Sequence, residues 1–230
     1  MATNTKGVRR MIIEVAGTNI KFDLREDYDT DNIVVDEIWE QNVYEVKGWN
    51  FFREDTGQEV VIDIGANIGS FSVYAAYNKA KVYAVEPEPN NYEALVKNIE
   101  LNNMQENITP VKLGISDYNG TAVISDEGGG ATILDGKSGA SIKVITLDKF
   151  IKDNNITSVG VLKIDVEGSE KEIILGASKE SLNICKYITI EFDVRTSKFL
   201  GEMVQKLSET HHIRTMGSWE RGGMIFAWLY

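Results

Sequence analysis

EVVIDIGANIGSFSVYAA, residues 59–76, is the stretch that decides the fold. Its β-branched run at Val60–Ile64 suits a strand that is buried on both faces, and Gly65 ends that run. From Ser70 onward, apolar residues recur at helical spacing. The stretch is therefore predicted to form a strand, a glycine turn and a helix, which together make the first half of a βαβ unit.

The turn at residues 65–69, Gly-Ala-Asn-Ile-Gly, has the composition of a ligand-binding turn. Gly65 leaves a bare surface, Asn67 tolerates a left-handed backbone, and Gly69 lets the helix begin close to its neighbours. A turn of this kind places backbone N–H groups of a helix N-terminus toward a ligand. Taken alone, the pattern also fits an ordinary loop between a strand and a helix.

The next predicted strand, Lys81–Val85, suggests which ligand binds. It delivers Glu86 to its carboxyl end, where a carboxylate can accept both ribose hydroxyls of a nucleoside. Asn67 occupies the position where a dinucleotide fingerprint has its second glycine, so pyrophosphate binding is disfavoured. A nucleoside without phosphates fits better, with Asp63 and the turn holding an amino-acid end. This description matches S-adenosylmethionine.

Composition excludes several classes of protein. The chain has 230 residues, 43% of them hydrophobic, and a formal charge of −11, which repels nucleic-acid phosphates. Its single cysteine, Cys185, cannot form an internal disulfide and favours a reducing, cytoplasmic setting. No apolar stretch approaches the roughly 20 residues of a membrane helix, so a soluble protein without membrane contacts is expected. Residues 1–58 are predicted to form an N-terminal cap, and residues 59–230 the main domain.

The predicted cap combines a hairpin with a helix. Met11–Leu24 alternates around a Gly-Thr pair as a β-hairpin does, and residues 31–45 have helical spacing. Trp39 and Trp49 add aromatic bulk. These aromatic residues either pack as core or, in the case of Tyr44, close over the cofactor.

The middle of the chain offers further candidates. Ile108–Ile115 is predicted as a third strand that carries Ser116 and Asp117 to its end, where they meet an adenine ring or form a turn. The Gly/Ser-rich segment at residues 126–140 reads either as a lid over the substrate or as an exposed hairpin. A helix follows at Leu147–Ile156.

The fourth predicted strand, Val159–Val166, contains charged residues. Lys163 and Asp165 share one face by the period of two, and Glu167 shares it too if the strand persists. Charges inside a buried strand cost several kcal/mol unless they are paired or used, so this is a candidate site. Glu191 lies near the end of the fifth strand. Alternating strands and helices, closed by an antiparallel hairpin at residues 214–230, predict a doubly wound α/β sheet.

These residues resemble the S-adenosylmethionine-dependent methyltransferases of the FkbM type. The resemblance is carried by VVIDIGANIGSFS at 60–72, VYAVEPEPNNYEALVKNIELNN at 82–103, GISDYNG at 114–120, ITLDKFI at 145–151 and, most specifically, LKIDVEGSEKEIILGA at 162–177. It implies a class I methyltransferase fold, Rossmann-like, with seven strands of which the last is antiparallel. It also implies methyl transfer to an oxygen of a small molecule or glycan, without naming the acceptor.

A hydroxyl acceptor must lose a proton during transfer, and Asp165, Glu167 and Glu191 are the candidate bases, with Asp165 or Glu167 preferred and Lys163 as the charge partner. Paired carboxylates could instead hold Mg²⁺, although a scheme without metal is preferred. The candidate cofactor contacts are Tyr44, Asp63, Gly65, Ala66, Asn67, Gly69, Ser70, Phe71, Glu86, Pro87, Ser116, Asp117 and Asp165. A non-catalytic cofactor-binding subunit and a redox enzyme with another adenosine ligand remain as alternatives.

Overall fold

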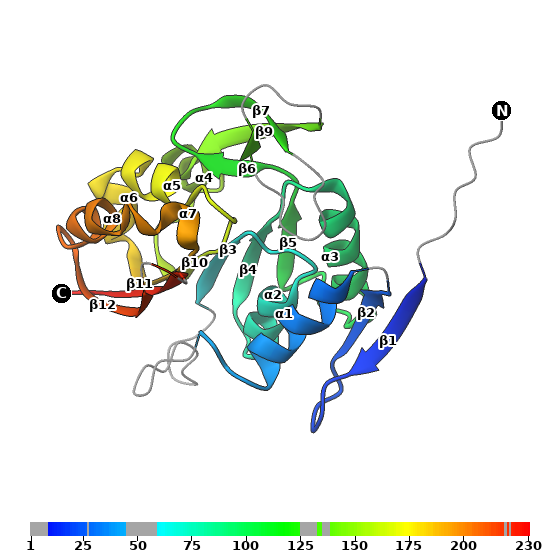
Figure 1. Cartoon of the computed structure of the whole chain (residues 1–230). Coiled ribbons are helices and arrows are strands. Elements are labelled where there is room, and N and C mark those ends of the chain that lie inside the picture. Colours follow the sequence, from blue (N-terminus) through cyan, green and yellow to red (C-terminus); the bar gives the residue numbers. More distant parts are fainter. Residues whose placement is uncertain are drawn as a thin grey trace.

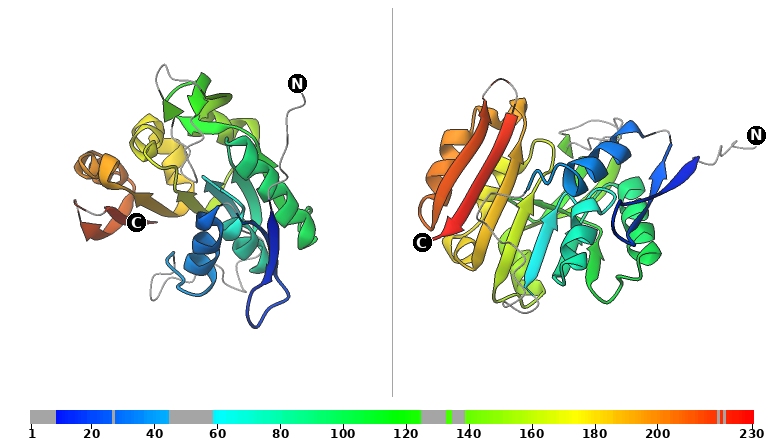
Figure 2. Two further views of the ribbon diagram at one scale, coloured as in Figure 1. Left: turned by 45° about the vertical axis from the view of Figure 1, so that its right-hand side comes forward. Right: turned by 90° about the horizontal axis from the view of Figure 1, so that it is seen from below.

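A seven-stranded sheet lies at the centre of the protein, with the strand order β12-β13-β11-β10-β3-β4-β5 (Figure 1). The computed structural model describes residues 9–26, 28–44, 59–124, 133–134, 139–218, 220 and 222–230. In sheet order, the strands are His211–Ser218, Gly222–Leu229, Cys185–Phe192, Val159–Ile164, Val60–Ile64, Lys81–Val85 and Ile108–Val111. Strands β11, β10, β3, β4 and β5 are parallel, and β13 runs antiparallel between β11 and β12 (Figure 2, right). The prediction of a doubly wound sheet with an antiparallel last strand is confirmed.

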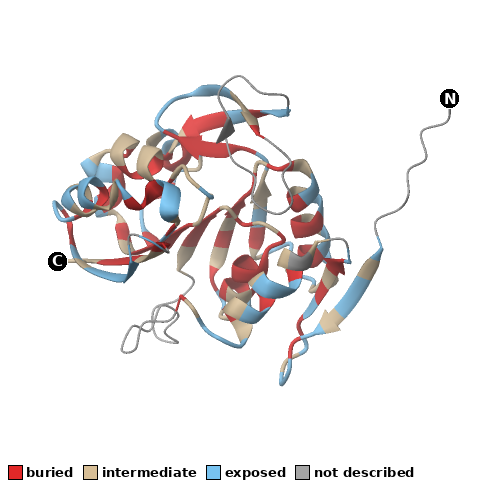
Figure 3. Cartoon of the chain, in the orientation of Figure 1, coloured by how far each residue is buried: buried red, intermediate tan, exposed pale blue. Residues whose placement is uncertain are grey.

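Helices cover both faces of this sheet, because neighbouring residues of each buried strand point to opposite sides. In β3, Val61 belongs to the hydrophobic cluster that includes residues of α2 and α3, whereas Ile62 belongs to the cluster that includes residues of α4, α5, α6 and α8. Figure 3 shows the buried residues gathered on the central strands and on the helix surfaces that face them. These helices span Ser70–Tyr77 (α2), Pro89–Leu101 (α3), Leu147–Asp153 (α4), Glu170–Gly176 (α5), Lys179–Asn183 (α6) and Leu200–Leu207 (α8).

The front of the chain forms the predicted hairpin and a shorter helix than predicted. Strands β1 (Arg10–Glu14) and β2 (Lys21–Arg25) pair antiparallel, and α1 spans Asp29–Trp39. The prediction that the helix continues to residue 45 is wrong, because Asn42 adopts a left-handed backbone with φ of 53°. Tyr44 therefore lies beyond the helix.

Two sets of contacts hold this front segment in place: one joins β2 to α3, which covers the main sheet, and the other joins β2 to α1. The side-chain oxygens of Asn98 on α3 and of Asn102, which follows α3, accept hydrogen bonds from backbone N–H groups of β2 at 2.7 and 2.9 Å. A buried ion pair of 2.6 Å between Arg25 and Asp31 then joins β2 to α1. The predicted domain boundary after residue 58 and Trp49 lie outside the described residues, so the division into a cap and a main domain stays a prediction.

The predicted strand Ile108–Ile115 is two strands. After β5 ends at Val111, the Leu113 N–H bonds back to the Val111 carbonyl at 3.2 Å, and this tight turn redirects the chain. Gly114 then begins β6 (Gly114–Ser116) in a second sheet of order β6-β9-β7-β8, in which the other strands are Gly120–Ile124 (β7), Ile133–Leu134 (β8) and Ala140–Thr146 (β9). Most of the predicted lid, at residues 126–132 and 135–138, falls outside the described residues.

Two smaller differences concern helices. The helix predicted at Leu147–Ile156 ends at Asp153 as α4, and the left-handed Asn155 follows it with φ of 51°. A four-residue helix, α7 (Val194–Ser197), was not predicted. In the described parts of the chain, no helix has the length and apolar character needed to cross a bilayer.

Candidate active site

A cavity of about 270 Å³ opens at the carboxyl ends of β3, β4 and β10. This volume is near the lower end of the range for small-molecule sites, roughly 300–1,000 Å³. A smaller cavity of about 40 Å³ shares part of its wall, including Gly65, Asn67 and Asp165. The position agrees with the rule that ligands of open α/β sheets bind outside the carboxyl ends of the strands.

The glycine turn after β3 is built for contact with the loop after β10. Gly65 has φ of 80°, and a Cβ there would lie 1.7 Å from the Asp165 carbonyl oxygen. The bare surface of Gly65 therefore admits the chain's own backbone, which corrects the expectation that a ligand needs this space. Asn67 is left-handed with φ of 51°, as predicted. A Cβ at Gly69 would meet Leu95 of α3 at 2.6 Å, so this glycine permits close packing of α2 on α3.

Lys163 is the buried cation at the centre of the site. Its ammonium group lies 3.2 Å from Asp63 Oδ1 and 3.4 Å from Asp165 Oδ2, and it donates to the Gly65 carbonyl at 2.9 Å. Burial opposes this charge, but Asp63 and Asp165 together raise the pKa of Lys163. The predicted pairing of Lys163 with a neighbouring carboxylate is confirmed.

Asp63 does not reach either cavity. It is fully buried, and its second carboxylate oxygen accepts a hydrogen bond of 2.6 Å from the Ser72 hydroxyl. The expected contact of Asp63 with the amino-acid end of a cofactor is therefore corrected: Asp63 acts on the site through Lys163.

The hydroxyl group of Tyr44 links Asp165, which follows β10, to Glu191 of β11. Its oxygen lies 3.2 Å from Asp165 Oδ2 and 3.1 Å from Glu191 Oε2. Burial, followed by the charges of Asp165 and Glu191, raises the pKa of Tyr44, so the phenol keeps its proton at neutral pH. One proton serves only one of these carboxylates at a time. Partial withdrawal from solvent and the charge of Asp165 raise the pKa of Glu191 to about 7.

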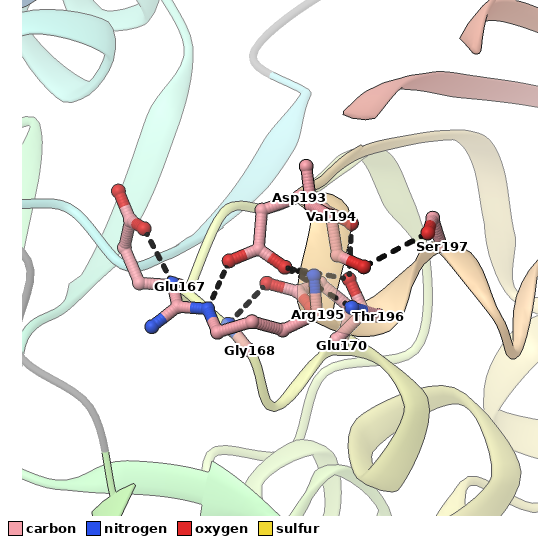
Figure 4. Close-up of polar contacts among 8 residues, drawn as sticks. All are labelled: Glu167, Gly168, Glu170, Asp193, Val194, Arg195, Thr196 and Ser197. Carbon is pink, nitrogen blue, oxygen red and sulfur yellow. Dashed lines mark hydrogen bonds and ion pairs between the residues drawn. The ribbon is translucent and has the colours of Figure 1, made fainter. Parts of the chain in front are cut away.

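Glu167 stands at the rim of the larger cavity, in the group drawn in Figure 4. Its φ of 55° turns the chain, and β10 has already ended at Ile164. The period-two pattern therefore stops before Glu167, so the condition for Glu167 to share a face with Lys163, a strand that persists to this residue, is not met. Glu167 instead accepts a hydrogen bond of 2.9 Å from Arg195, which also donates to Asp193. Burial and the charge of Asp165 raise the pKa of Glu167, and the opposite charge of Arg195 offsets part of this rise.

The comparison with known families decides the identity of this fold. Residues 63–220 match the model of the methyltransferase FkbM domain. The chain belongs to the FkbM methyltransferase family. The resemblance seen in the sequence is thus confirmed, and the class I methyltransferase fold with it.

Individual relatives of this FkbM-family chain are distant. It is 26% identical to the hexuronic acid methyltransferase AglP of Haloferax volcanii over 83% of this chain and 78% of that protein. It is also 26% identical to the methyltransferase sdnD of Sordaria araneosa, over 57% of this chain and 65% of sdnD. The crystal structure of an FkbM methyltransferase from Methylobacillus flagellatus KT is similar in fold, with a TM-score of 0.52 and 21% identity. That match covers 74% of this chain but only 43% of the other.

Most of the residues predicted for the site of this FkbM-family protein do come together. Those that line the larger cavity are Gly65, Asn67, Glu86, Pro87, Asp165, Glu167 and Glu191. Those that line the smaller cavity are Tyr44, Gly65, Ala66, Asn67, Ser70, Phe71, Lys163 and Asp165.

Four of the predicted residues line neither cavity: Asp63, Gly69, Ser116 and Asp117. The predicted position of Ser116 and Asp117 at the end of the third strand is corrected: Ser116 ends β6 of the second sheet, and Asp117 follows it and is exposed. Leu113, Gly114 and Ile115 line the cavity in their place.

Sequence reasoning missed Glu37 and Arg195. Glu37 lines both cavities from α1, where it is one of several acidic residues without a distinguishing motif. Arg195 follows Asp193 directly after the fifth strand, and a polar cluster at the carboxyl end of a parallel strand was the signal that could have marked it.

Two polar side chains at the cavities lack partners among the described residues. Ser70 is only 3% exposed, and its hydroxyl group makes no hydrogen bond. The buried Oδ1 of Asn67 also has no hydrogen-bond partner. Buried polar atoms are satisfied in more than nine cases out of ten, so atoms left unpaired here point to a ligand.

Glu86 is buried behind the glycine turn. Its two carboxylate oxygens accept hydrogen bonds from the backbone N–H groups of Asn67 at 2.8 Å and Glu88 at 2.9 Å. Burial raises the pKa of Glu86 to about 7, against its ordinary value of 4.5. The carboxylate thus supports the turn itself, and Glu86 also lines the larger cavity.

This pKa predicts how stability depends on pH. Because the folded-state pKa lies above the unfolded one, the contribution of Glu86 to the unfolding free energy is complete below about pH 4.5 and is lost as the pH rises through 7. Glu86→Gln removes this titration. Between pH 5 and pH 8, urea unfolding should show the wild type losing about 2–3 kcal/mol more than the variant. Equal losses in the two proteins would contradict the assignment.

Proposed function

We propose that the chain is an S-adenosylmethionine-dependent methyltransferase that acts on a hydroxyl oxygen of a small molecule or glycan. The observation that carries the proposal is the carboxylate of Glu191, which stands in the cavity wall beside Tyr44 with a pKa of about 7. A base of this strength suits an alcohol, which loses its proton as its oxygen is methylated. The hexuronic acid methyltransferase among the relatives supports an acceptor of the glycan type.

The residues at the cavities suit the proposed cofactor. The unpartnered Oδ1 of Asn67 can accept from an ammonium group, and the Ser70 hydroxyl can donate to a carboxylate. Glu86 would accept from ribose hydroxyls, and the carboxylates around Asp165 favour a positively charged ligand. When bound, S-adenosylmethionine supplies an electrophilic methyl group to an acceptor oxygen.

We assign the base to Glu191 rather than to Asp165. Asp165 Oδ2 already receives the Lys163 ion pair and a hydrogen bond from Tyr44. Glu167 is held at the rim by Arg195. Glu191 remains open to the cavity, and its pKa of about 7 lets it accept a proton near neutral pH. Tyr44 positions Glu191 and holds the two carboxylates together.

Tyr44→Phe tests this positioning role. The variant keeps the ring, which packs edge-to-face on Phe71 at 5.3 Å, and removes the hydrogen bond that lowers the pKa of Glu191. The rise of the methyl-transfer rate with pH should therefore move to higher pH by about one unit. The measurement is the pH profile of kcat/KM, with cofactor affinity as the control. An unshifted profile would remove Tyr44 from the mechanism.

One experiment tests the function as a whole. Calorimetry with S-adenosylhomocysteine measures cofactor binding, and labelled S-adenosylmethionine measures transfer to a panel of glycans and metabolites. We expect binding and transfer to a hydroxyl compound. Binding without transfer to any acceptor would favour a non-catalytic cofactor-binding subunit. Absence of binding would overturn the proposal and reopen the redox alternative.

A further inference from the structure

Part of the wall of the larger cavity comes from residues that precede the range matched by the family model. The match begins at residue 63, yet Thr30, Ile33, Val34 and Glu37 of α1 line the cavity. Tyr44, which follows α1, lines the smaller one. Members of one family that share a cofactor fold differ in acceptor through the elements added to it. This places acceptor selection in α1.

The charges on this wall have one sign. Glu37, Asp165, Glu167 and Glu191 all line the larger cavity. The cations nearby are engaged: Lys163 is paired with Asp63 and Asp165, and Arg195 with Asp193 and Glu167. A carboxylate or phosphate on an incoming acceptor would meet this excess of negative charge without a described cation to receive it.

An apolar side chain completes this wall of the larger cavity. Ile33 of α1 leaves 52% of its surface exposed there, where it offers an apolar contact beside the carboxylates. A wall of one aliphatic side chain and several carboxylates suits a polyol or an amino sugar, whose hydroxyl and ammonium groups donate hydrogen bonds.

We propose that Glu37 is a specificity-determining residue and that the acceptor is an uncharged or cationic hydroxyl compound rather than an anionic one. The inference rests on the proposed function, and it separates this chain from the hexuronic acid methyltransferase among its relatives, whose name gives an acidic sugar. Glu37 comes from α1, which lies outside the family match, so among the carboxylates of this wall it is the one that does not belong to the matched methyltransferase domain. Burial, and after it the charge of Asp165, raises the pKa of Glu37, as expected for carboxylates that face a common space.

The test uses the full chain saturated with S-adenosylhomocysteine and three matched probes, the methyl glycosides of glucose, glucosamine and glucuronic acid. Saturation-transfer NMR titrations measure their affinities. We expect glucosamine and glucose derivatives to bind, and the glucuronate to bind at least about tenfold more weakly, because like charges in contact are strongly unfavourable. Glu37→Lys should bring the glucuronate to within about threefold of the glucose derivative, and Glu37→Gln should lie between.

Glu40→Lys is the matched control, since it makes the same charge change on an exposed residue at the end of α1 that does not line the cavity. Its probe affinities should equal those of the wild type. The inference is overturned if the glucuronate binds as well as the other probes, if none of the three binds, or if Glu37→Lys behaves like Glu40→Lys. Loss of S-adenosylhomocysteine binding by the wild type would instead refute the proposed function, and this inference with it.

Discussion

Replacing Glu191 with glutamine is expected to lower the rate of methyl transfer by about 10²–10⁴-fold, the usual contribution of a general base. The amide has nearly the shape of the carboxylate and can still contact Tyr44, but it cannot accept the proton of the acceptor hydroxyl. Affinity for S-adenosylhomocysteine should change much less, because the fold and the glycine turn are untouched. Single-turnover rates and calorimetry on the same preparation measure the two effects separately.

A second readout of this variant is its pH profile. In the wild type, the rate should rise with pH through about 7, since Glu191 must be ionised to act. Glu191→Gln should lose this rise along with the rate. Glu100→Gln is the control, because Glu100 is an exposed residue of α3 remote from both cavity linings. Full turnover by Glu191→Gln would move the base to Glu167 or Asp165, whereas equal losses in rate and affinity would make Glu191 a cofactor contact.

Gly65→Ala is the second substitution with a large expected effect. Its Cβ would lie 1.7 Å from the Asp165 carbonyl oxygen, so the turn or the loop after β10 must move. The positive φ of 80° adds strain of about 1–3 kcal/mol. Since both cavities are lined by Gly65 and Asp165, we expect cofactor affinity to fall by at least about 100-fold. The melting temperature should also fall, by about 2–4 °C per kcal/mol lost.

Gly17→Ala separates the effect of backbone strain from that of the steric clash expected in Gly65→Ala. Gly17 has φ of 74°, close to that of Gly65, but no atom lies within 4 Å of a Cβ built there. This variant should lose stability through backbone strain alone and keep full cofactor affinity. If Gly65→Ala and Gly17→Ala lowered the melting temperature equally and both bound S-adenosylhomocysteine normally, the close approach of the two loops would have no functional role.

Local patterns predicted the parallel strands well because each is a short apolar run between breakers. Val60–Ile64 and Lys81–Val85 have the predicted bounds, and both end where a glycine or an acidic residue follows. The division of residues 108–115 could not be read from the sequence. It depends on the turn after Val111 and on the packing of Gly114 against Val144 of β9, which lies 30 residues farther along the chain. Only the folded chain supplies that contact.

The candidate site was predictable where charge stood out against an apolar background. Lys163 and Asp165 were found because ionisable groups beside a buried strand require partners, and those partners are present. Glu37 and Arg195 were missed because a charged residue on a helix or loop has an ordinary solvent-exposed explanation. The role of Asp63 was misjudged for another reason: sequence position gives the strand, but it does not say whether a carboxylate meets a ligand or a lysine.

The attachment of β2 to α3 and of α1 to β2 has a consequence for the entropy of binding. Hydrogen bonds from β2 to the side chains of Asn98 and Asn102, together with the buried Arg25–Asp31 pair, hold α1 in place through contacts that involve no ligand. Ordering a flexible segment costs about 1–2 kcal/mol per residue in backbone freedom. Because α1 is anchored before an acceptor arrives, residues on its cavity face can be exchanged for others without this cost, and a new acceptor preference requires few substitutions.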